Sequence, residues 1–545
     1  MDKIKIIKAS CGCEFKSEDG KHPKIDFGSI DLRCRKTWDL IGSGATKGVF
    51  QLESHLGREW AKRVKPSNIE DLAALVALIR PGCLRAMSGD PPKSMTQRYC
   101  DRKNGQEITE YFHESLEPIL NKTYGVLVYQ EQAMKIAQVI AGFNLQEADV
   151  LRKAIGKKKA DIMTRVEGQF IKGCQNEGIV NEDQAKEIFG WIRESQRYSF
   201  NKSHAVSYAK NAYWSAYCKA HFPHEFFCSY LRGSAWKQDT HYEVYELVND
   251  ARLSDIDVTV PSFSSIRKTF YIEKDYIRFG LSDIKQVGSS AVDKIQEKAS
   301  EVELLLNKST EQWTWEEYLI FFSKSVASTV NVAMASCGAF DGFRIARNRM
   351  LYELEIWNRL TVKEMAWIQE TKHWPSLKDS LLACQPTKKE GGGCSTYKRA
   401  DILADLIKTL EKPPHSLEDT PAWIAWAEEK YLGVGITCNR VDGCEDSIRA
   451  NTTCKEFIDG KSGHMIVAVE VNKVKQIITK NGKSPGSKMA FLTVSDSSCA
   501  LDNVVCFPSQ WKENQGTLQE GNTILLQGER DKRKGGFIVQ KVWQI

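Results

Sequence analysis

The sequence predicts a protein of several domains that is mainly α-helical and ends in a small β-barrel. Apolar residues recur at helical spacing through much of residues 35–240, and five short runs with strand patterning follow one another near the end of the chain. A length of 545 residues allows three or more domains. We expect an N-terminal appendage (1–34), a helical domain (35–240), a hairpin-bearing domain (241–384), a linker (385–398), a helical connector (399–454) and a barrel domain (455–545).

Composition is that of an ordinary globular protein, with 42% hydrophobic and 27% charged residues. The sequence has no apolar run near 18 residues, and its first residues do not read as a signal peptide. We therefore expect neither membrane insertion nor secretion, but a cytoplasmic protein. A net charge of +6 is mild, so it would attract nucleic acid only where it is locally concentrated.

Sixteen cysteines without an export signal are expected to be free thiols or metal ligands rather than disulfides. One group, Cys11, Cys13, His22 and Cys34, has the ligand types of a tetrahedral zinc site. Its spacing is irregular, and Cys-x-Cys is a weaker signal than Cys-x-x-Cys. Plain thiols are therefore the favoured interpretation, with zinc as the alternative.

Residues 121–220 form the part around which the chain is organised. Apolar residues at positions 133, 136, 137 and 140 lie on one helical face, and positions 185, 188, 189 and 192 repeat the pattern. Asn181 and Gln184 have the spacing of a capping box at the start of the second helix. These helices are expected to form a platform for charged and aromatic side chains.

A basic cluster lies between these two helices. Gly156 is expected to end the helix that carries Arg152 and Lys153, so that Lys157, Lys158 and Lys159 project from a turn. A solvated loop is the commoner role of a lone charge run. The neighbouring Tyr198, Asn201 and His204 favour phosphate and base binding instead.

Two other segments are expected to be structural. Residues 85–110 are polar, contain Pro91-Pro92, and are expected to form a surface excursion. The glycine-rich residues 42–48 lack the Gly-Lys-Ser/Thr ending of a phosphate-binding loop, so a simple turn is expected there.

Six motifs occur in a fixed order along the first part of the chain. They are Gly48-Val-Phe-Gln-Leu-Glu-Ser54, Arg80-Pro-Gly82, residues 123–134, Leu151-Arg-Lys-Ala-Ile-Gly-Lys157, Phe200-Asn-Lys-Ser-His204 and Lys219-Ala-His-Phe-Pro223. Together they resemble the fingers domain of the C-family replicative DNA polymerases, the family of the bacterial DNA polymerase III alpha subunit. Two departures affect loop geometry: Arg197-Tyr-Ser199 replaces the usual Gly-Tyr-Gly, and Cys83 replaces a common proline.

The resemblance implies roles for particular residues. Arg152, Lys153, Tyr198, Asn201 and His204 would face the incoming deoxynucleoside triphosphate and the template-primer junction. The residues that would bind DNA are Lys157, Lys158, Lys159 and Lys202.

Two further DNA-binding elements are expected in the second part of the chain, and the first of them is a glycine turn. The glycine turn in residues 283–292 resembles a helix-hairpin-helix, whose backbone N–H groups bind a DNA phosphate without reading sequence. Lys285, Val287 and Gly288 would make this contact, although Gln286 stands where the family has a second glycine.

The five strand-like runs of the C-terminal segment fit a Greek-key barrel of the OB type, a fold that the family also carries here. Residues 461–545 hold twelve Lys and Arg against seven Asp and Glu, a local excess of five positive charges. A groove that binds single-stranded DNA needs such an excess. The expected DNA-binding residues are Lys473, Lys475, Lys532 and Arg533.

Polymerases of this family hold two catalytic metal ions with paired aspartates of a palm domain. Those aspartates precede residues 48–54 in the family and are not found in this sequence, while Asp255 and Asp257 read as a solvated turn. The interpretation is the C-terminal part of a split, phage-type polymerase. It would need a palm-bearing partner chain that binds Mg²⁺, and no clean sliding-clamp peptide is present.

Two alternatives stay open. One is a non-catalytic DNA-binding replication protein derived from such a polymerase. The other is a zinc-dependent nucleic-acid enzyme that uses the N-terminal cysteines, for which no acid-base glutamate stands in a recognisable motif.

Overall fold

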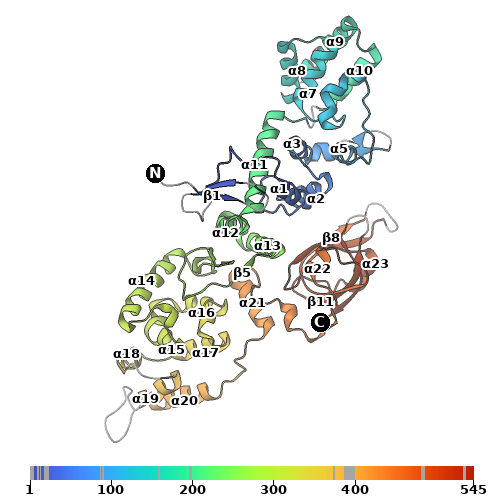
Figure 1. The fold of residues 1–545 in the computed structure, drawn as a ribbon. Coiled ribbons are helices and arrows are strands. Elements are labelled where there is room, and N and C mark those ends of the chain that lie inside the picture. The colour runs from blue at the N-terminus through green and yellow to red at the C-terminus, as the bar shows by residue number, and fades with distance from the viewer. Residues whose placement is uncertain are drawn as a thin grey trace. The chain divides into compact units, whose positions relative to one another are not determined.

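The computed structural model divides into two compact units, Met1–Pro223 and His224–Ile545, each of which is described by itself (Figure 1). The described residues are 5–8, 12, 14–17, 24–85, 87–88, 91–157, 160–195, 199–371, 375–385, 399–479, 485–531 and 535–545. The predicted linker, residues 385–398, therefore lies outside the description apart from its first residue.

The first unit is helical, with two short hairpins. Its helices are α1 (Arg35–Ser43), α2 (His55–Val64), α3 (Ile69–Leu78), α4 (Pro81–Arg85), α5 (Met95–Lys103), α6 (Glu117–Leu120), α7 (Gln130–Ala141), α8 (Leu145–Lys157), α9 (Ala160–Glu177), α10 (Glu182–Ser195) and α11 (Lys202–His221). The hairpins pair β1 (Lys5–Lys8) with β2 (Glu14–Ser17), and β3 (Met87–Ser88) with β4 (Lys93–Ser94). The expected helical character is confirmed.

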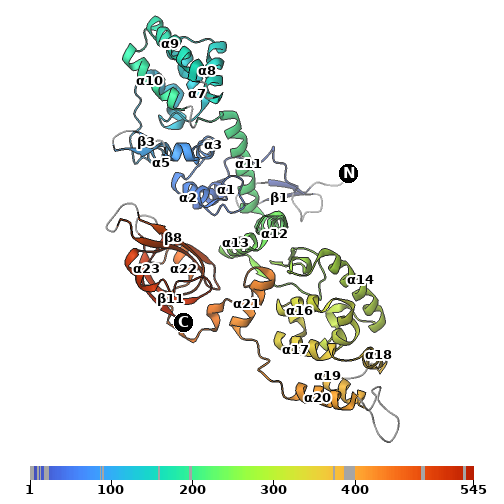
Figure 2. The same ribbon diagram turned by 180° about the vertical axis from the view of Figure 1, so that it is seen from behind.

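Two separate hydrophobic cores divide this unit into two lobes (Figures 1 and 2). The base lobe is formed by α1–α5 and α11, and the helix lobe by α6–α10. Tyr99 of α5 is fully buried in the base lobe, so the expected surface excursion at residues 85–110 is wrong for its central helix. Thr96 and Asp101 of α5 are buried together with Tyr99 and Cys100, and Thr96 Oγ1 donates to the Leu78 carbonyl over 2.8 Å, so polar residues in this segment do not mark its surface.

Two helix ends in the helix lobe were predicted from local sequence patterns. The capping box is confirmed, because the Asn181 N–H donates to Gln184 Oε1 over 3.0 Å and the Gln184 N–H donates to Asn181 Oδ1 over 2.8 Å. Gly156 was expected to end α8, and the described helix ends one residue later, at Lys157. A glycine inside a helix costs only about 1 kcal/mol relative to alanine, so it does not by itself end one.

The glycine-rich turn at residues 42–48 is confirmed as structural. Gly44 ends α1 with a left-handed φ of 73°, and Gly48 has a φ of 75°. The ammonium group of buried Lys219 donates to the carbonyl oxygens of Ala45 (2.8 Å) and Lys47 (3.0 Å). The turn is thus held by α11, and its carbonyls are already used as acceptors.

The second unit begins with helices and a small sheet. Its main helices are α12 (Pro223–Gly233), α13 (Thr240–Leu253), α14 (Ser289–Leu306), α15 (Trp315–Glu317), α16 (Ser328–Ser336), α17 (Arg347–Asn358), α18 (Val362–Thr371), α19 (Leu377–Cys384), α20 (Ala400–Glu411), α21 (Pro421–Leu432), α22 (Cys454–Ile458) and α23 (Pro508–Asn514). The sheet has the order β5 (Asp257–Thr259), β7 (Tyr276–Arg278), β6 (Tyr271–Glu273). One large core joins the sheet and helices α12–α21, whereas α22 and α23 pack into the core of the barrel.

A closed barrel ends the second unit. Its strands are β8 (Met465–Ile478), β9 (Lys488–Ser495), β10 (Ala500–Cys506), β11 (Thr523–Arg530) and β12 (Phe537–Gln544), in the order β10-β12-β11-β8-β9. Strands β10 and β12 pair in parallel, whereas the other neighbours are antiparallel. This connectivity, with α23 between β10 and β11, is that of the OB fold. The predicted OB-type barrel is confirmed.

Candidate functional site

The N-terminus of α11 is fixed by its own cap and by α7. Asn201 is the N-cap residue, and its Oδ1 accepts from the His204 N–H over 2.9 Å. Its Nδ2 donates to Glu131 Oε1 over 2.9 Å, and the Lys202 N–H donates to Glu131 Oε2 over 2.9 Å. Two motifs that lie seventy residues apart in the sequence therefore meet at one carboxylate. Asn201 is already used on both sides of its amide.

Gln132 fixes the segment that leads into α7. Its Oε1 accepts from the N–H groups of Val128 and Tyr129, both at 3.0 Å, and its Nε2 donates to Thr123 Oγ1 at 2.8 Å. The side chain is buried, with 8% exposure. The density of polar residues in the 123–134 motif therefore has a structural reason: Gln132 supplies the hydrogen bonds of a buried, irregular segment.

The segments that enter α7 and α11 are joined by a short backbone bridge. Phe200 N–H donates to the Val128 carbonyl at 3.1 Å, and Gln130 N–H donates to the Phe200 carbonyl at 3.0 Å. This short parallel pairing of Tyr129 with Phe200 holds the segments before α7 and α11 side by side. It places Phe200-Asn-Lys-Ser-His204 directly beside the start of α7.

Arg152 and Lys153 lie on α8 and share one carboxylate. Arg152 donates to Asp149 Oδ1 from Nε (2.9 Å) and Nη2 (2.8 Å), and Lys153 Nζ lies 2.8 Å from Asp149 Oδ2. The hydrogen bonds from Lys153 and Arg152 lower the pKa of Asp149. The sequence analysis missed Asp149, although its i, i+3 and i, i+4 spacing to the two cations was readable. A phosphate bound here would compete with it.

A row of rings connects three of the sequence motifs on the base lobe. The His204 ring centroid lies 4.2 Å from that of Tyr208 and 5.3 Å from that of Phe200. The Phe50 ring centroid lies 5.1 Å from that of Tyr208, with the rings tilted by 38°, and the Arg80 guanidinium carbon lies 3.6 Å from the centre of the Phe200 ring. We call these five side chains the ring row. The sequence did not predict it, because its members are up to 158 positions apart.

Other predicted residues of the first unit are placed less fully. Lys202 Nζ lies 3.2 Å from Glu70 Oε2, so it is ion-paired rather than isolated. Lys157 is described only as the last residue of α8. Tyr198, Lys158 and Lys159 lie outside the described residues, and their roles stay predictions.

The predicted hairpin in the second unit consists of one turn of 3-10 helix, residues Leu281–Asp283, followed by α14. Val287 is buried and its N–H donates to the Ile284 carbonyl at 3.0 Å, so that amide is already used. Lys285 is exposed, and Gly288 is the N-cap residue of α14. A helix-hairpin-helix therefore stays a prediction, since a full first helix does not precede the turn.

Lys473 and Lys475 are exposed on β8, as a DNA-binding role needs. Lys473 Nζ lies 5.2 Å from the ring centre of Tyr242 in α13, an aromatic side chain that is 45% exposed. Lys532 and Arg533 lie outside the described residues.

The described part of the chain contains no group of three or more His, Cys, Asp or Glu side chains that could hold a metal ion. Cys34 Sγ lies 3.3 Å from His221 Nε2, while Cys11, Cys13 and His22 lie outside the description, so the zinc site stays a prediction. Asp255 is exposed and ion-paired with Lys455, in agreement with a solvated turn.

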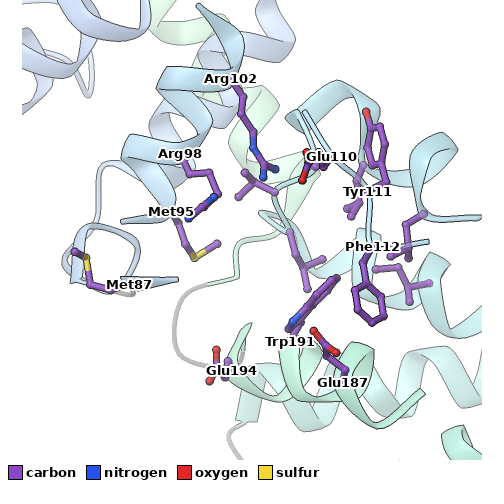
Figure 3. A pocket seen from close by; sticks show the side chains of 16 residues that line it. Met87, Met95, Arg98, Arg102, Glu110, Tyr111, Phe112, Glu187, Trp191 and Glu194 are labelled. Atoms are coloured by element: carbon purple, nitrogen blue, oxygen red, sulfur yellow. The ribbon is translucent and has the colours of Figure 1, made fainter. Parts of the chain in front are cut away.

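A cavity of about 460 Å³ lies between α5 and α10 in the first unit, beside the residues that connect the lobes (Figure 3). The side chains of Arg98 and Arg102 extend from α5 toward it, and Trp191 enters from α10 (Figure 3). Both arginines bind Glu107 Oε1 at 2.8 Å. Both arginines of this cavity are therefore already ion-paired, and they share one carboxylate.

Comparison with known proteins shows which proteins the chain is similar to. Residues 6–178 match the model of the bacterial DNA polymerase III alpha subunit finger domain. The chain is 31% identical over 526 residues to DNA polymerase III subunit alpha of Aquifex aeolicus, covering 95% of this chain and 40% of that protein. The corresponding values are 31% over 523 residues for Bacillus subtilis and 28% over 515 for Staphylococcus aureus (95% and 94% of this chain, 42% of each relative).

A helical unit that matches the finger-domain model is thus followed, further along the chain, by an OB-type barrel. More particularly, residues 6–178 are similar to the finger domain of the DNA polymerase III alpha subunit, and the chain as a whole is similar to a C-terminal part of that subunit. It spans about two fifths of the length of the curated relatives that it matches. Among the described helices, none has the length and apolar character needed to cross a bilayer.

Proposed function

We propose that this chain is the nucleotide- and template-primer-binding part of a C-family DNA-directed DNA polymerase used in DNA replication. The observation that carries the proposal is the ring row. It brings the motifs at residues 48–54, 80–82 and 200–204 to one surface of the base lobe. Exposed rings beside cations are what stacking on bases and holding phosphates need.

In this proposal each predicted residue has a separate task. Arg152 and Lys153 bind the triphosphate, whose oxygens compete with Asp149 for the two cations when the nucleotide enters. Asn201 sets the start of α11, and the exposed His204 meets the sugar or base. On the barrel, Lys473 and Lys475 bind the single-stranded template, and the turn at Lys285 and Gly288 binds duplex phosphates.

We further propose that catalysis requires a palm-bearing partner chain. Nucleotidyl transfer by two metal ions needs paired carboxylates, and the described residues contain no group of three or more His, Cys, Asp or Glu side chains that could hold a metal ion. Mg²⁺ would therefore be held by the palm, and we assign no step on the metal to this chain. The proposed setting is the cytoplasm of a bacterium or of a phage-infected cell.

The test is primer extension with the chain alone and with a palm-bearing partner. We expect no extension by the chain alone and metal-dependent extension by the mixture. In the mixture, Arg152→Ala, Lys153→Ala or His204→Ala should each lower the rate of nucleotide incorporation. The expected decrease is roughly 10²–10³-fold, which is the usual effect of losing one donor that stabilises charge in the transition state. Lys172→Ala, an exposed lysine of α9 in the same lobe, is the matched control.

Robust extension by the chain alone would contradict the partner requirement. Unchanged kinetics in all three variants, with normal thermal melting, would contradict the assignment of this surface to nucleotide binding. Binding of DNA without any nucleotide effect would favour the alternative, a DNA-binding replication protein without catalysis.

A further inference from the structure

Among the described side chains of the first unit, three cations that the sequence motifs single out have carboxylate partners. Arg152 and Lys153 are held by Asp149, and Lys202 by Glu70. An anion that binds any of them must displace or share an existing ion pair. Their electrostatic attraction for a phosphate is therefore reduced before binding begins.

Arg80 differs from these cations. Within the described residues its guanidinium has neither a hydrogen-bond acceptor nor an ion-pair partner, and its contact is the face of the Phe200 ring at 3.6 Å. Burial lowers the pKa of Arg80, because few polar groups replace the water that it has lost. An arginine remains charged at any physiological pH, so this site carries a partly desolvated positive charge.

Stacking on Phe200 also orients the guanidinium. A ring that contacts one face of the planar group leaves its N–H edge available, and that edge binds phosphate oxygens in a bidentate way. Phe200 is fixed by its backbone bridge to Val128 and Gln130, so the platform under Arg80 is rigid. The next ring in the row is the exposed His204, at 5.3 Å from Phe200.

A purely structural role would look different. Arg63 also stacks on an aromatic ring, with its guanidinium carbon 4.0 Å from the Trp60 ring centre. However, Arg63 also donates to Gln97 and lies 3.7 Å from Glu59, so its hydrogen-bonding capacity is used within the protein. The comparison separates an arginine that holds the fold together from one whose N–H groups await an acceptor.

We propose that Arg80 is a phosphate-binding residue of the ring row. It would take a non-bridging phosphate oxygen pair on its N–H edge while Phe200 supports its face. Two sources carry this chemistry: the triphosphate of an incoming nucleotide and the backbone of template-primer DNA. Only the choice between these sources rests on the proposed function, because the site itself is defined by its chemistry.

The experiment uses the full chain and three probes: inorganic tripolyphosphate, a deoxynucleoside triphosphate, and a primer-template duplex titrated at several salt concentrations. Arg80→Gln should weaken tripolyphosphate binding about tenfold or more, as expected for loss of a charged hydrogen-bonding group. Arg63→Gln should leave it unchanged. Arg80→Lys keeps the charge but loses the planar fork, and it should bind at an intermediate strength. Thermal melting checks the folding of all three.

The arms separate the sources. If the nucleotide arm weakens and the DNA arm does not, the phosphate is that of the triphosphate. If the slope of log K against log salt for DNA falls by about 1, it is a backbone phosphate. If Arg80 governs tripolyphosphate binding while neither nucleotide nor DNA binds, the site stands and the proposed function falls. Equal binding by the wild type and Arg80→Gln, equal losses in the Arg80 and Arg63 variants, or no binding of any probe would overturn the proposal.

Discussion

Replacing Gln132 by methionine should loosen the bridge between the two lobes. Methionine keeps an unbranched side chain of similar length but removes the amide, so the N–H groups of Val128 and Tyr129 lose their 3.0 Å acceptor. A buried donor left without a partner costs about 1–3 kcal/mol. For two donors in a site that can relax, we expect a local loss of about 3 kcal/mol.

Hydrogen exchange measures this loss where it occurs, which global unfolding of a chain with several domains does not. A loss of about 3 kcal/mol corresponds to roughly 100-fold faster exchange of the Val128 and Tyr129 amides. Gln146→Ala, at an exposed position of α8, is the control and should change neither amide. If Gln132→Met leaves exchange in residues 123–134 at the wild-type rate, the structural explanation of this motif is wrong.

Three further outcomes are expected. Asp149→Asn releases Arg152 from its ion pair, so an equilibrium titration should show several-fold tighter nucleotide binding, and weaker binding would mean that Asp149 positions the cations rather than competing for them. Tyr129→Phe removes a buried hydroxyl that has no partner among the described residues, so the melting temperature should stay level or rise, corresponding to about 1 kcal/mol at most, and a clear fall would reveal a missed partner. Burial raises the pKa of Glu470 to about 7, above its unfolded value near 4.5. Its stabilising contribution is therefore complete below about pH 4.5 and is lost as pH rises through 7. Glu470→Gln should flatten this part of the barrel's urea-unfolding profile between pH 5 and 8, and an unchanged profile would assign the slope to another group.

Features that depend on neighbouring residues were predictable from the sequence. The capping box at Asn181 and Gln184 needs only four residues, and the barrel strands have alternating patterns and turn residues of their own. Each of the five expected strand runs overlaps a strand of the barrel closely. Gly156 shows the limit of such reasoning, because the conformational preference of one glycine predicts a helix end only to within a residue or two.

Features that depend on distant residues were not predictable. Tyr99 is buried because α2, α3 and the 124–129 segment surround it, and nothing in residues 85–110 announces those neighbours. The same holds for Arg80, whose motif was recognised but whose stacking on Phe200 joins positions 120 apart. Ion pairing has the same dependence when it is not local. The Lys202–Glu70 pair could not be read from the sequence, whereas the pairs of Asp149 could.

The bridge between Phe200 and the Val128–Gln130 segment has a consequence for how this protein can be altered. The chain enters α7 and returns after α10 at backbone groups that are joined by hydrogen bonds of 3.0–3.1 Å, so helices α7–α10 of the helix lobe form an insertion with adjacent ends, whereas α6 precedes it. Insertions of this kind can be shortened, lengthened or exchanged while the surrounding scaffold keeps its course. A graft that preserves Glu131, Gln132 and the bridge would change the cations offered to a nucleotide without moving Arg80 or His204. The lobe is thus a natural unit for recombination between relatives.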